Sequence, residues 1–269
     1  MKRGQEQSGF DLAVSRAVAK ALNKPLQIVW YESKIEKDKS PALTVNALLS
    51  GAYCDLVAGY ILYRGVLGEP ASAKAQLPEV DGGQRGSRNK EWVRLGAISP
   101  SKPYHFLPLT VVLGAGAGKR QVRLLSDLHG LVIGTETATL AAHLLSMYRG
   151  GMLRNALRTF APGEEVLHAL DKGEIDATLV ELQRVDAYWA RHPGTRIRQT
   201  GYQHSLGFNV GFVALMRSSA LLAQVNKTLD ALIASGALPT MAQEAGMTYV
   251  APRSPAVLEQ INPALLVGD

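Results

Sequence analysis

The chain has 269 residues, of which 46% are hydrophobic and 19% are charged, a balance that is typical of folded proteins and excludes a disordered chain. A length above about 250 residues favours two compact lobes over a single core. The net charge of +6 suits an acidic partner. Nucleic acid is nevertheless not expected as a partner, because the segment at 66–91, which contains a cluster of basic residues, holds no aromatic side chains that could stack on bases.

The single cysteine, Cys54, cannot form an intramolecular disulfide and is expected to be a buried structural thiol. No apolar run approaches the roughly 18 residues that a membrane-spanning helix needs, so the chain is not expected to span a membrane. The opening residues, MKRGQEQSGF, are not followed by the apolar segment of a signal peptide.

The first sixty residues alternate between helix and strand patterns. Apolar residues recur on one helical face over residues 9–22, and Pro25 prevents that helix from continuing. A short apolar run at 26–30 predicts a strand, residues 43–49 a helix, and residues 55–59 a second strand. This order predicts a parallel sheet with helices packed against it.

Residues 66–91 interrupt the pattern with glycine, proline and basic side chains. A structureless segment of this length is uncommon in compact domains, and two interpretations stay open, a surface insertion and a partner-binding arm. Apolar structure resumes at 92–98. The string SPSKPYHF at 99–106 predicts a polar turn, and residues 107–113 predict another strand.

The string GAGAGKR at 114–120 resembles a phosphate-binding loop only superficially. Leu113 and Arg120 stand where that loop requires glycine and serine or threonine, so the segment is interpreted as a flexible crossing between lobes. Further elements are expected as strands at 131–134, 175–180, 195–200 and 209–215, and as helices at 139–148, 164–170, 185–190, 221–233 and 239–245.

The two crossings, at 114–120 and 209–215, divide the chain into two lobes. Lobe 1 is expected to be discontinuous and to contain residues 1–113 and 214–269, with lobe 2 formed by residues 114–213. Two α/β lobes joined by two separate crossings form a hinge. The organisation therefore predicts a protein that closes on a ligand held between its lobes.

Polar residues stand where two strands of lobe 2 run into helices. Thr137 and Thr139 follow the strand at 131–134, and Glu181 follows the strand at 175–180. Ligands of α/β sheets bind at the carboxyl ends of strands, and helix N-termini attract anions, so these three residues are candidate ligand contacts. The threonines are equally suited to cap the next helix, and Glu181 to stabilise a helix N-terminus.

In lobe 1 the candidate ligand contacts are Tyr60, Tyr104 and Arg64. The alternative interpretation makes the tyrosines ordinary half-buried aromatics and Arg64 a solvated charge. The six histidines show no metal-binding spacing, and neither a G-x-S-x-G motif nor a Cys/His arrangement surrounds Cys54. No catalytic residue, metal or cofactor is therefore expected, and the chain is not expected to be an enzyme.

Five segments, in the right order, resemble the type II periplasmic solute-binding proteins and are close to amino-acid-binding family 3. They are GFDLAVSRAVAKAL, NALLSGAYCDLVAGY, SKPY, DLHGLVIGTETAT and EVLHALDKGEIDATLVE. The resemblance implies the type II periplasmic-binding-protein fold, in which a two-strand hinge joins two α/β lobes, with the family's first strand missing before Gly9. It also implies a monomeric periplasmic protein that binds a small polar or amino-acid-like solute for an ABC permease.

The same resemblance assigns roles to individual residues. Thr137 and Thr139 match the polar helix start that holds a ligand carboxylate, and Glu181 matches the acid that binds the ligand amine. Arg64 stands earlier than the family's clamping arginine, and the family's neighbouring threonines are replaced by ILY. In these departures, the chain is similar to the solute-binding-like proteins that are associated with quinoprotein dehydrogenases, including methanol dehydrogenases. That resemblance implies the alternative function, a non-transport accessory protein that uses the fold as a scaffold for the dehydrogenase.

Overall fold

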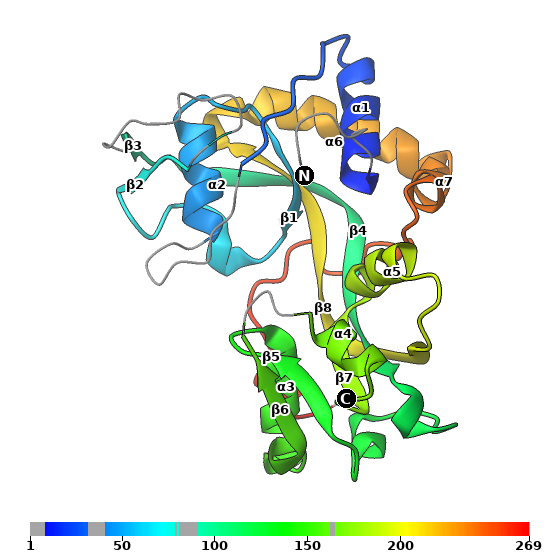
Figure 1. The fold of residues 1–269 in the computed structure, drawn as a ribbon. Helices are drawn as coiled ribbons and strands as arrows, with labels where there is room; N and C mark the ends of the chain where they lie inside the picture. The colour runs from blue at the N-terminus through cyan, green and yellow to red at the C-terminus, as the bar shows by residue number, and fades with distance from the viewer. Residues whose placement is uncertain (1–8, 32–40, 79, 81–90, 162–164, 269) are drawn as a thin grey trace. The chain divides into compact units, whose positions relative to one another are not determined.

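The computed structural model describes residues 9–31, 41–78, 80, 91–161 and 165–268 (Figure 1). The basic residues of the segment at 66–91 that was interpreted either as a surface insertion or as a partner-binding arm, Arg85, Arg88 and Lys90, lie outside this described part of the chain. The chain divides into two compact units. Unit 1 comprises Met1–Phe106, Asn209–Ala245 and Ala251–Gln260, and unit 2 comprises Leu107–Phe208, Gly246–Val250 and Ile261–Asp269.

Two long strands contribute residues to both units. They are β4 (Ile98–Leu113) and β8 (Arg198–Leu215). Sequence patterns placed the crossings at 114–120 and 209–215, and in the structure the chain passes between the units inside these strands. Residues 114–120 instead contain a short 3₁₀ turn, η2 (Ala115–Ala117).

The helices of unit 1 follow the predicted patterns closely. They are α1 (Phe10–Ala21), α2 (Pro41–Ser50), α6 (Ser219–Ala234) and α7 (Ala237–Glu244), with short 3₁₀ turns η1 (Arg64–Val66) and η6 (Met216–Ser218). In α1, Phe10, Val14 and Val18 are buried, which is the apolar face that the spacing indicated. None of the helices in the described part of the chain is long and apolar enough to cross a membrane.

The strands of unit 1 differ from the prediction. The run at 26–30 forms no strand, and only Tyr31 makes an isolated bridge, to Val80. Its side chains remain partly or fully exposed, so burial does not stabilise an extended pairing there. The prediction of a parallel sheet for the first sixty residues is also wrong, because β1 (Val57–Ile61) pairs antiparallel with β8.

Residues 66–91 are not wholly without structure. Their described part contains β2 (Lys74–Gln76), which pairs antiparallel with β3 (Trp92–Arg94). The prediction of a polar turn at 99–106 is wrong as well, because these residues belong to strand β4. Ser101 Oγ accepts a hydrogen bond of 2.8 Å from Phe212 N, so a polar side chain takes part in pairing the strands.

Unit 2 contains a mixed sheet in the order β8-β4-β7-β5-β6. Strand β5 (Ile133–Glu136) is parallel to β6 (Leu157–Phe160) and to β7 (Ala177–Glu181), and β7 is antiparallel to β4. The helices are α3 (Leu140–Met147), α4 (Val166–Asp171), α5 (Leu182–Arg191) and α8 (Pro263–Val267), with 3₁₀ turns η3 (Leu125–Leu128), η4 (Tyr148–Gly150) and η5 (Arg154–Ala156). Sequence patterns did not predict β6 or α8.

The core of unit 2 lies between the sheet and α4 and α5. Val166 and Leu170 of α4 and Val185 and Tyr188 of α5 pack with Val180 of β7 in one buried cluster. This packing holds the carboxyl ends of β5 and β7 at a common edge, which is where the predicted polar residues stand.

Candidate functional site at the ends of β5 and β7

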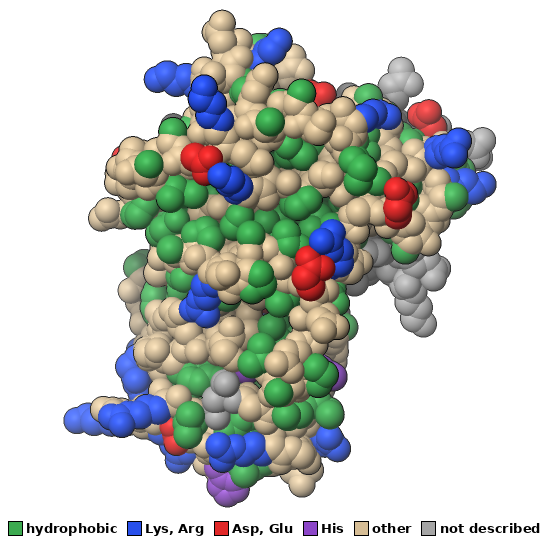
Figure 2. All heavy atoms as spheres, turned by 180° about the vertical axis from the view of Figure 1, so that it is seen from behind, with side chains coloured by type: hydrophobic (Ala, Val, Ile, Leu, Met, Phe, Trp, Pro, Cys, Tyr) green, Lys and Arg blue, Asp and Glu red, His purple; other side chains and the backbone are tan. Residues whose placement is uncertain are grey.

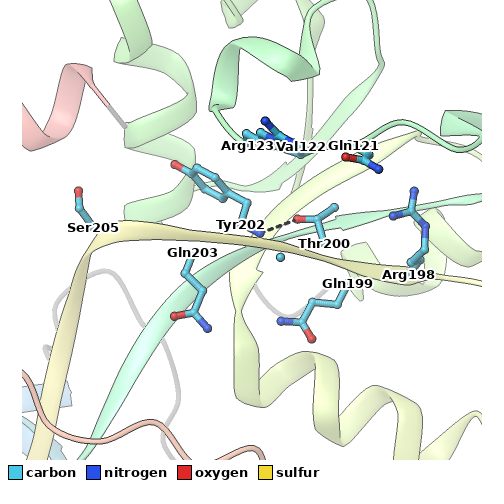
Figure 3. Close-up of a pocket in the computed structure, with 10 residues that line it drawn as sticks. Gln121, Val122, Arg123, Arg198, Gln199, Thr200, Tyr202, Gln203 and Ser205 are labelled. Atoms are coloured by element: carbon cyan, nitrogen blue, oxygen red, sulfur yellow. Dashed lines mark hydrogen bonds between the residues drawn. The ribbon is translucent and has the colours of Figure 1, made fainter.

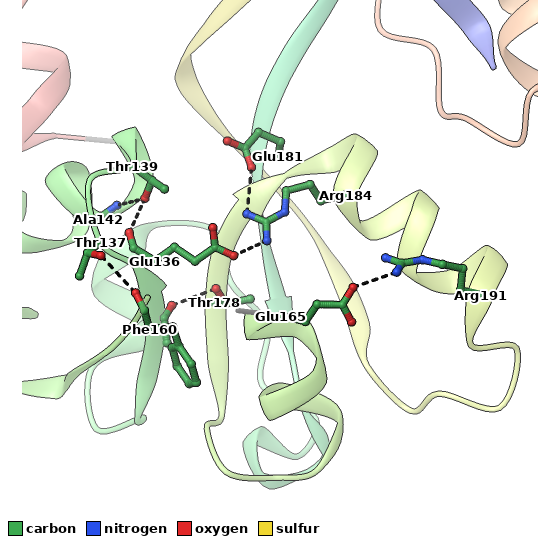
Figure 4. Close-up of polar contacts among 11 residues, drawn as sticks. Glu136, Thr137, Thr139, Ala142, Phe160, Glu165, Thr178, Glu181, Arg184 and Arg191 are labelled. Atoms are coloured by element: carbon green, nitrogen blue, oxygen red, sulfur yellow. Dashed lines mark hydrogen bonds and ion pairs between the residues drawn. The ribbon is translucent and has the colours of Figure 1, made fainter. Parts of the chain in front are cut away.

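The turn from β5 into α3 is fixed by Thr139. Its hydroxyl donates to the Glu136 carbonyl at 2.7 Å and accepts from Ala142 N at 3.1 Å, so Thr139 is the N-cap of α3 (Figure 4). Ala138 has a φ of 61°, a left-handed conformation that a non-glycine residue adopts at a cost of roughly 1 kcal/mol. The cap and this tight turn place the first backbone N–H groups of α3 next to the end of β5.

Thr137 lies at the same edge and is exposed. Its backbone N donates to the Phe160 carbonyl at 3.0 Å, and its hydroxyl lies 3.3 Å from the same oxygen. The hydroxyl therefore keeps its lone pairs available as acceptors while its position is held by the end of β6. Thr137 and Thr139 thus stand together at the start of α3, as the sequence predicted.

Glu181 ends β7 and is the N-cap residue of α5, without a hydrogen bond from its side chain to the helix. Its side chain is 38% exposed, and its carboxylate lies 3.8 Å from the guanidinium of Arg184. Arg184 makes a closer ion pair with Glu136, whose side chain is only 9% exposed. Figure 4 shows the Arg184 side chain lying between the two carboxylates.

The electrostatics of this cluster are dominated by the buried carboxylate. Burial disfavours the charged form of Arg184, but the hydrogen bond and charge of Glu136 outweigh it, so the pKa of Arg184 is raised. The positive charge of Arg184 thereby compensates the negative charge of the buried Glu136 carboxylate. Since the cluster holds two carboxylates and one guanidinium, the exposed carboxylate of Glu181 carries the excess negative charge.

Sequence patterns did not identify Glu136 and Arg184 as part of this site. Two signals were present: Glu136 directly precedes Thr137, and Arg184 stands three residues after Glu181 at the start of α5. Acid and base at that spacing face each other on a helix. Neither signal indicates the pairing of Arg184 with Glu136, because those residues are 48 positions apart.

The chemistry of this edge suits a ligand that carries both charges. The Glu181 carboxylate can accept hydrogen bonds from an ammonium group, and the start of α3 presents backbone donors to a carboxylate. A dianion is disfavoured, because the cluster already has excess negative charge.

The three lobe 1 residues that were predicted to contact the ligand, Arg64, Tyr60 and Tyr104, each form hydrogen bonds with other residues of unit 1. Arg64 makes a bidentate ion pair with Glu259, with N–O distances of 2.8 and 2.9 Å, and both side chains are largely exposed. This hydrogen bond lowers the pKa of Glu259. Tyr60 is buried, and its hydroxyl donates to the Val66 carbonyl at 3.0 Å.

Tyr104 is fully buried, and its hydroxyl is part of a short chain of hydrogen bonds. It donates to Asp11 Oδ1 at 2.6 Å and accepts from Gly59 N at 2.7 Å. Its only hydroxyl proton is therefore already used. The assignment of Arg64, Tyr60 and Tyr104 to ligand binding stays a prediction, and in unit 1 each has a structural partner.

Cys54 is half-buried, and burial raises the pKa of its thiol to about 11. It is therefore protonated at neutral pH and a poor nucleophile. Among the described residues, no group of three or more His, Cys, Asp or Glu side chains is placed to hold a metal ion.

No family model and no curated protein matches the chain. Several solved structures, however, are similar to the chain. Substrate-binding domain 2 of Lactococcus lactis GlnP, in an open conformation, is 16% identical, with a TM-score of 0.60 over 89% of this chain and 86% of that one. The unliganded, open L-cystine solute receptor of Neisseria gonorrhoeae is 16% identical, with a TM-score of 0.60 over 94% and 89%.

The GluR0 ligand-binding core in complex with L-glutamate is also similar, with 16% identity and a TM-score of 0.58 over 88% of this chain and 89% of that one. Matches of this length, in which both units take part, confirm the predicted fold class. The chain has the α/β fold of the type II periplasmic binding proteins, with two lobes.

Proposed function

We propose that the chain is a periplasmic solute-binding protein that takes up a small polar, amino-acid-like ligand and serves an ABC permease. The observation that carries this proposal is the exposed Glu181 carboxylate, which shares one edge of the unit 2 sheet with the capped start of α3. Support comes from the similar structures, which include a substrate-binding domain, an L-cystine receptor and a ligand-binding core with bound L-glutamate.

In this proposal each polar residue of the edge has one role. Glu181 accepts the ligand ammonium, while Thr137 and the first N–H groups of α3 hold the ligand carboxylate. Thr139 positions these N–H groups by capping the helix, and Glu136 holds Arg184 in place and neutralises it. Without Glu136, the guanidinium would compete with the ligand for Glu181.

The proposal includes closure of the two units on the solute. Two of the similar structures are described as open conformations, which supports a protein of this fold that changes shape around its ligand. In this proposal the closing motion bends the chain where it passes from one unit to the other inside β4 and β8.

A thermal-shift screen tests the proposal. Amino acids, their amides, organic acids and simple amines are added to the purified protein, and a zwitterionic or cationic solute is expected to raise its melting temperature. A ligand present at 100 times its dissociation constant adds about 2.7 kcal/mol to the free energy of unfolding. If only dianions stabilise the protein, or if no solute does, the proposed ligand class is wrong.

The alternative function is that of an accessory protein of a periplasmic quinoprotein dehydrogenase such as methanol dehydrogenase, in which lobe 1 does not clamp a solute. Arg64 is held by Glu259 in an exposed bidentate pair, so the lobe 1 position nearest to the family's clamping arginine already has an anionic partner. The structures compared above give this alternative no support. Co-purification of a dehydrogenase with a protein that binds none of the screened solutes would favour it.

A further inference from the structure

A second polar site lies in unit 2, away from the ends of β5 and β7. It is a pocket of about 710 Å³, formed by the first part of β8 and by the segment that follows η2 (Figure 3). It shares no lining residue with the cluster around Glu181. Besides Thr200 and Tyr202, its polar lining residues are Gln121 and Arg123 of the segment after η2 and four residues of β8, Arg198, Gln199, Gln203 and Ser205.

The lining is cationic. Arg123 and Arg198 approach the pocket from two different segments, and none of the residues that line it is acidic. The remaining polar groups are mainly amides and hydroxyls, which donate hydrogen bonds without adding negative charge. Figure 2, which views the molecule from behind, shows blue Lys and Arg side chains along the lower part of the picture, with little red among them.

Two of the guanidinium groups at or beside the pocket, those of Arg198 and Arg120, are held by carbonyl groups. Arg198 Nη2 donates to the Arg120 carbonyl at 2.9 Å and lies 3.3 Å from that of Gly118. Arg120 Nη1 in turn donates to the carbonyls of Asp127 and His129, both at 2.8 Å. Carbonyl partners fix the direction of a guanidinium group but leave its full positive charge uncompensated.

The carboxylate of Asp127, which lies close to Arg120 and Arg123, is already engaged. Asp127 Oδ2 accepts hydrogen bonds from the backbone N of Arg123 at 2.7 Å and of Leu124 at 3.0 Å. These bonds, together with the charges of Arg120 and Arg123, lower the pKa of Asp127. Asp127 thus lies near the charges of both Arg120 and Arg123, and none of the residues that line the pocket adds a negative charge beside Arg123 and Arg198.

The floor of the pocket is rigid. Thr200 and Tyr202 are buried residues of β8. The Thr200 hydroxyl donates to the Val111 carbonyl of β4 at 3.0 Å and accepts from Tyr202 N at 3.2 Å, and Thr110 Oγ1 donates to the Tyr202 carbonyl at 2.8 Å. These side-chain bonds tie β8 to β4 beneath the pocket and hold its floor in place.

From this arrangement we infer that the pocket binds a small, multiply charged oxyanion, with Arg123 and Arg198 as its charged contacts. Planar guanidinium groups match the oxygens of carboxylates and phosphates, and nearby amide donors add hydrogen bonds. The site is independent of the proposed solute site, which favours a ligand with an ammonium group.

Calorimetric titration with citrate and with inorganic phosphate, at constant ionic strength in sodium chloride, tests the inference. At least one of the two is expected to bind, and the comparison separates a carboxylate preference from a phosphate preference. Arg123→Gln is the primary variant. The Arg123 side chain makes no hydrogen bond to another described residue, so its replacement is not expected to unfold the protein. It is expected to weaken binding about tenfold.

Arg217→Gln, which removes the same charge from an exposed position in unit 1, is the matched control and should leave the affinity within about twofold. The inference is overturned if neither anion binds, or if Arg123→Gln and Arg217→Gln weaken binding equally. Equal effects would mean that net charge, and not this pocket, attracts the anion.

Discussion

Tyr104→Phe is expected to lower the free energy of unfolding by about 3 kcal/mol at pH 7, because it breaks a buried hydrogen-bond chain at its centre. The Asp11 carboxylate loses its donor, and Gly59 N loses its acceptor. Gly59 is held tightly in this place: its φ is 69°, and a Cβ there would lie 2.6 Å from Asp11 Oδ2. Urea unfolding of the variant and the wild type measures the loss.

The loss should depend on pH in a defined direction. Burial raises the pKa of Asp11, and the hydrogen bond from Tyr104 opposes that rise. The folded state therefore holds the Asp11 proton more tightly than the unfolded state, and stability falls as pH rises through the folded pKa. Removal of the Tyr104 hydroxyl raises that pKa further. The destabilisation should thus be smaller near pH 4 than at pH 7.

Tyr60→Phe is the matched control in the same unit. It removes one hydroxyl that donates to a neutral carbonyl, that of Val66, and should cost about 1 kcal/mol with no such pH dependence. Equal losses for the two variants at both pH values would show that Asp11 and Tyr104 are not coupled.

Arg184→Met is expected to lower the free energy of unfolding by about 2 to 3 kcal/mol, because it leaves the buried Glu136 carboxylate without its cation. The expected loss of stability is smaller than for a fully buried ion pair because the Arg184 side chain is 37% exposed. Thermal or urea unfolding checks the loss, and Glu136→Gln in the same chain should recover most of it.

Arg191→Met provides the control. Arg191 pairs with Glu165 at 2.8 Å, but the two side chains are 58% and 44% exposed. An exposed pair contributes up to about 1 kcal/mol. If the Arg184 and Arg191 variants are equally stable, or if the added Glu136→Gln recovers nothing, Glu136 is not an electrostatic partner that the fold depends on.

Local patterns in the sequence predicted those features that depend on neighbours along the chain. The apolar face of α1 is set by residues three and four positions apart, and the capping of α3 by Thr139 needs only the next helical turn. The position of Glu181 at the end of β7 likewise followed from an apolar run and its end.

The features that were not predicted depend on residues far apart in sequence. The polar string at 99–106 forms a strand because its groups find distant partners, as when Phe212 N donates to Ser101 Oγ across 111 positions. Asp11 and Tyr104 meet across 93 positions, and Glu136 and Arg184 across 48. Tertiary contacts of this kind override local propensity, and no spacing in a single sequence specifies them.

The central claim, that Glu181 binds the ammonium group of the solute, is tested most directly by one set of calorimetric titrations. The ligand found by screening and its analogue without the amino group are titrated into the wild type and into Glu181→Gln. Glu174→Gln, an exposed acid of the same unit paired with Arg158, is the control. The wild type and the control should prefer the ligand over the analogue by about tenfold or more. In Glu181→Gln, that preference should disappear. A Glu181→Gln protein that keeps the preference of the wild type would contradict the claim.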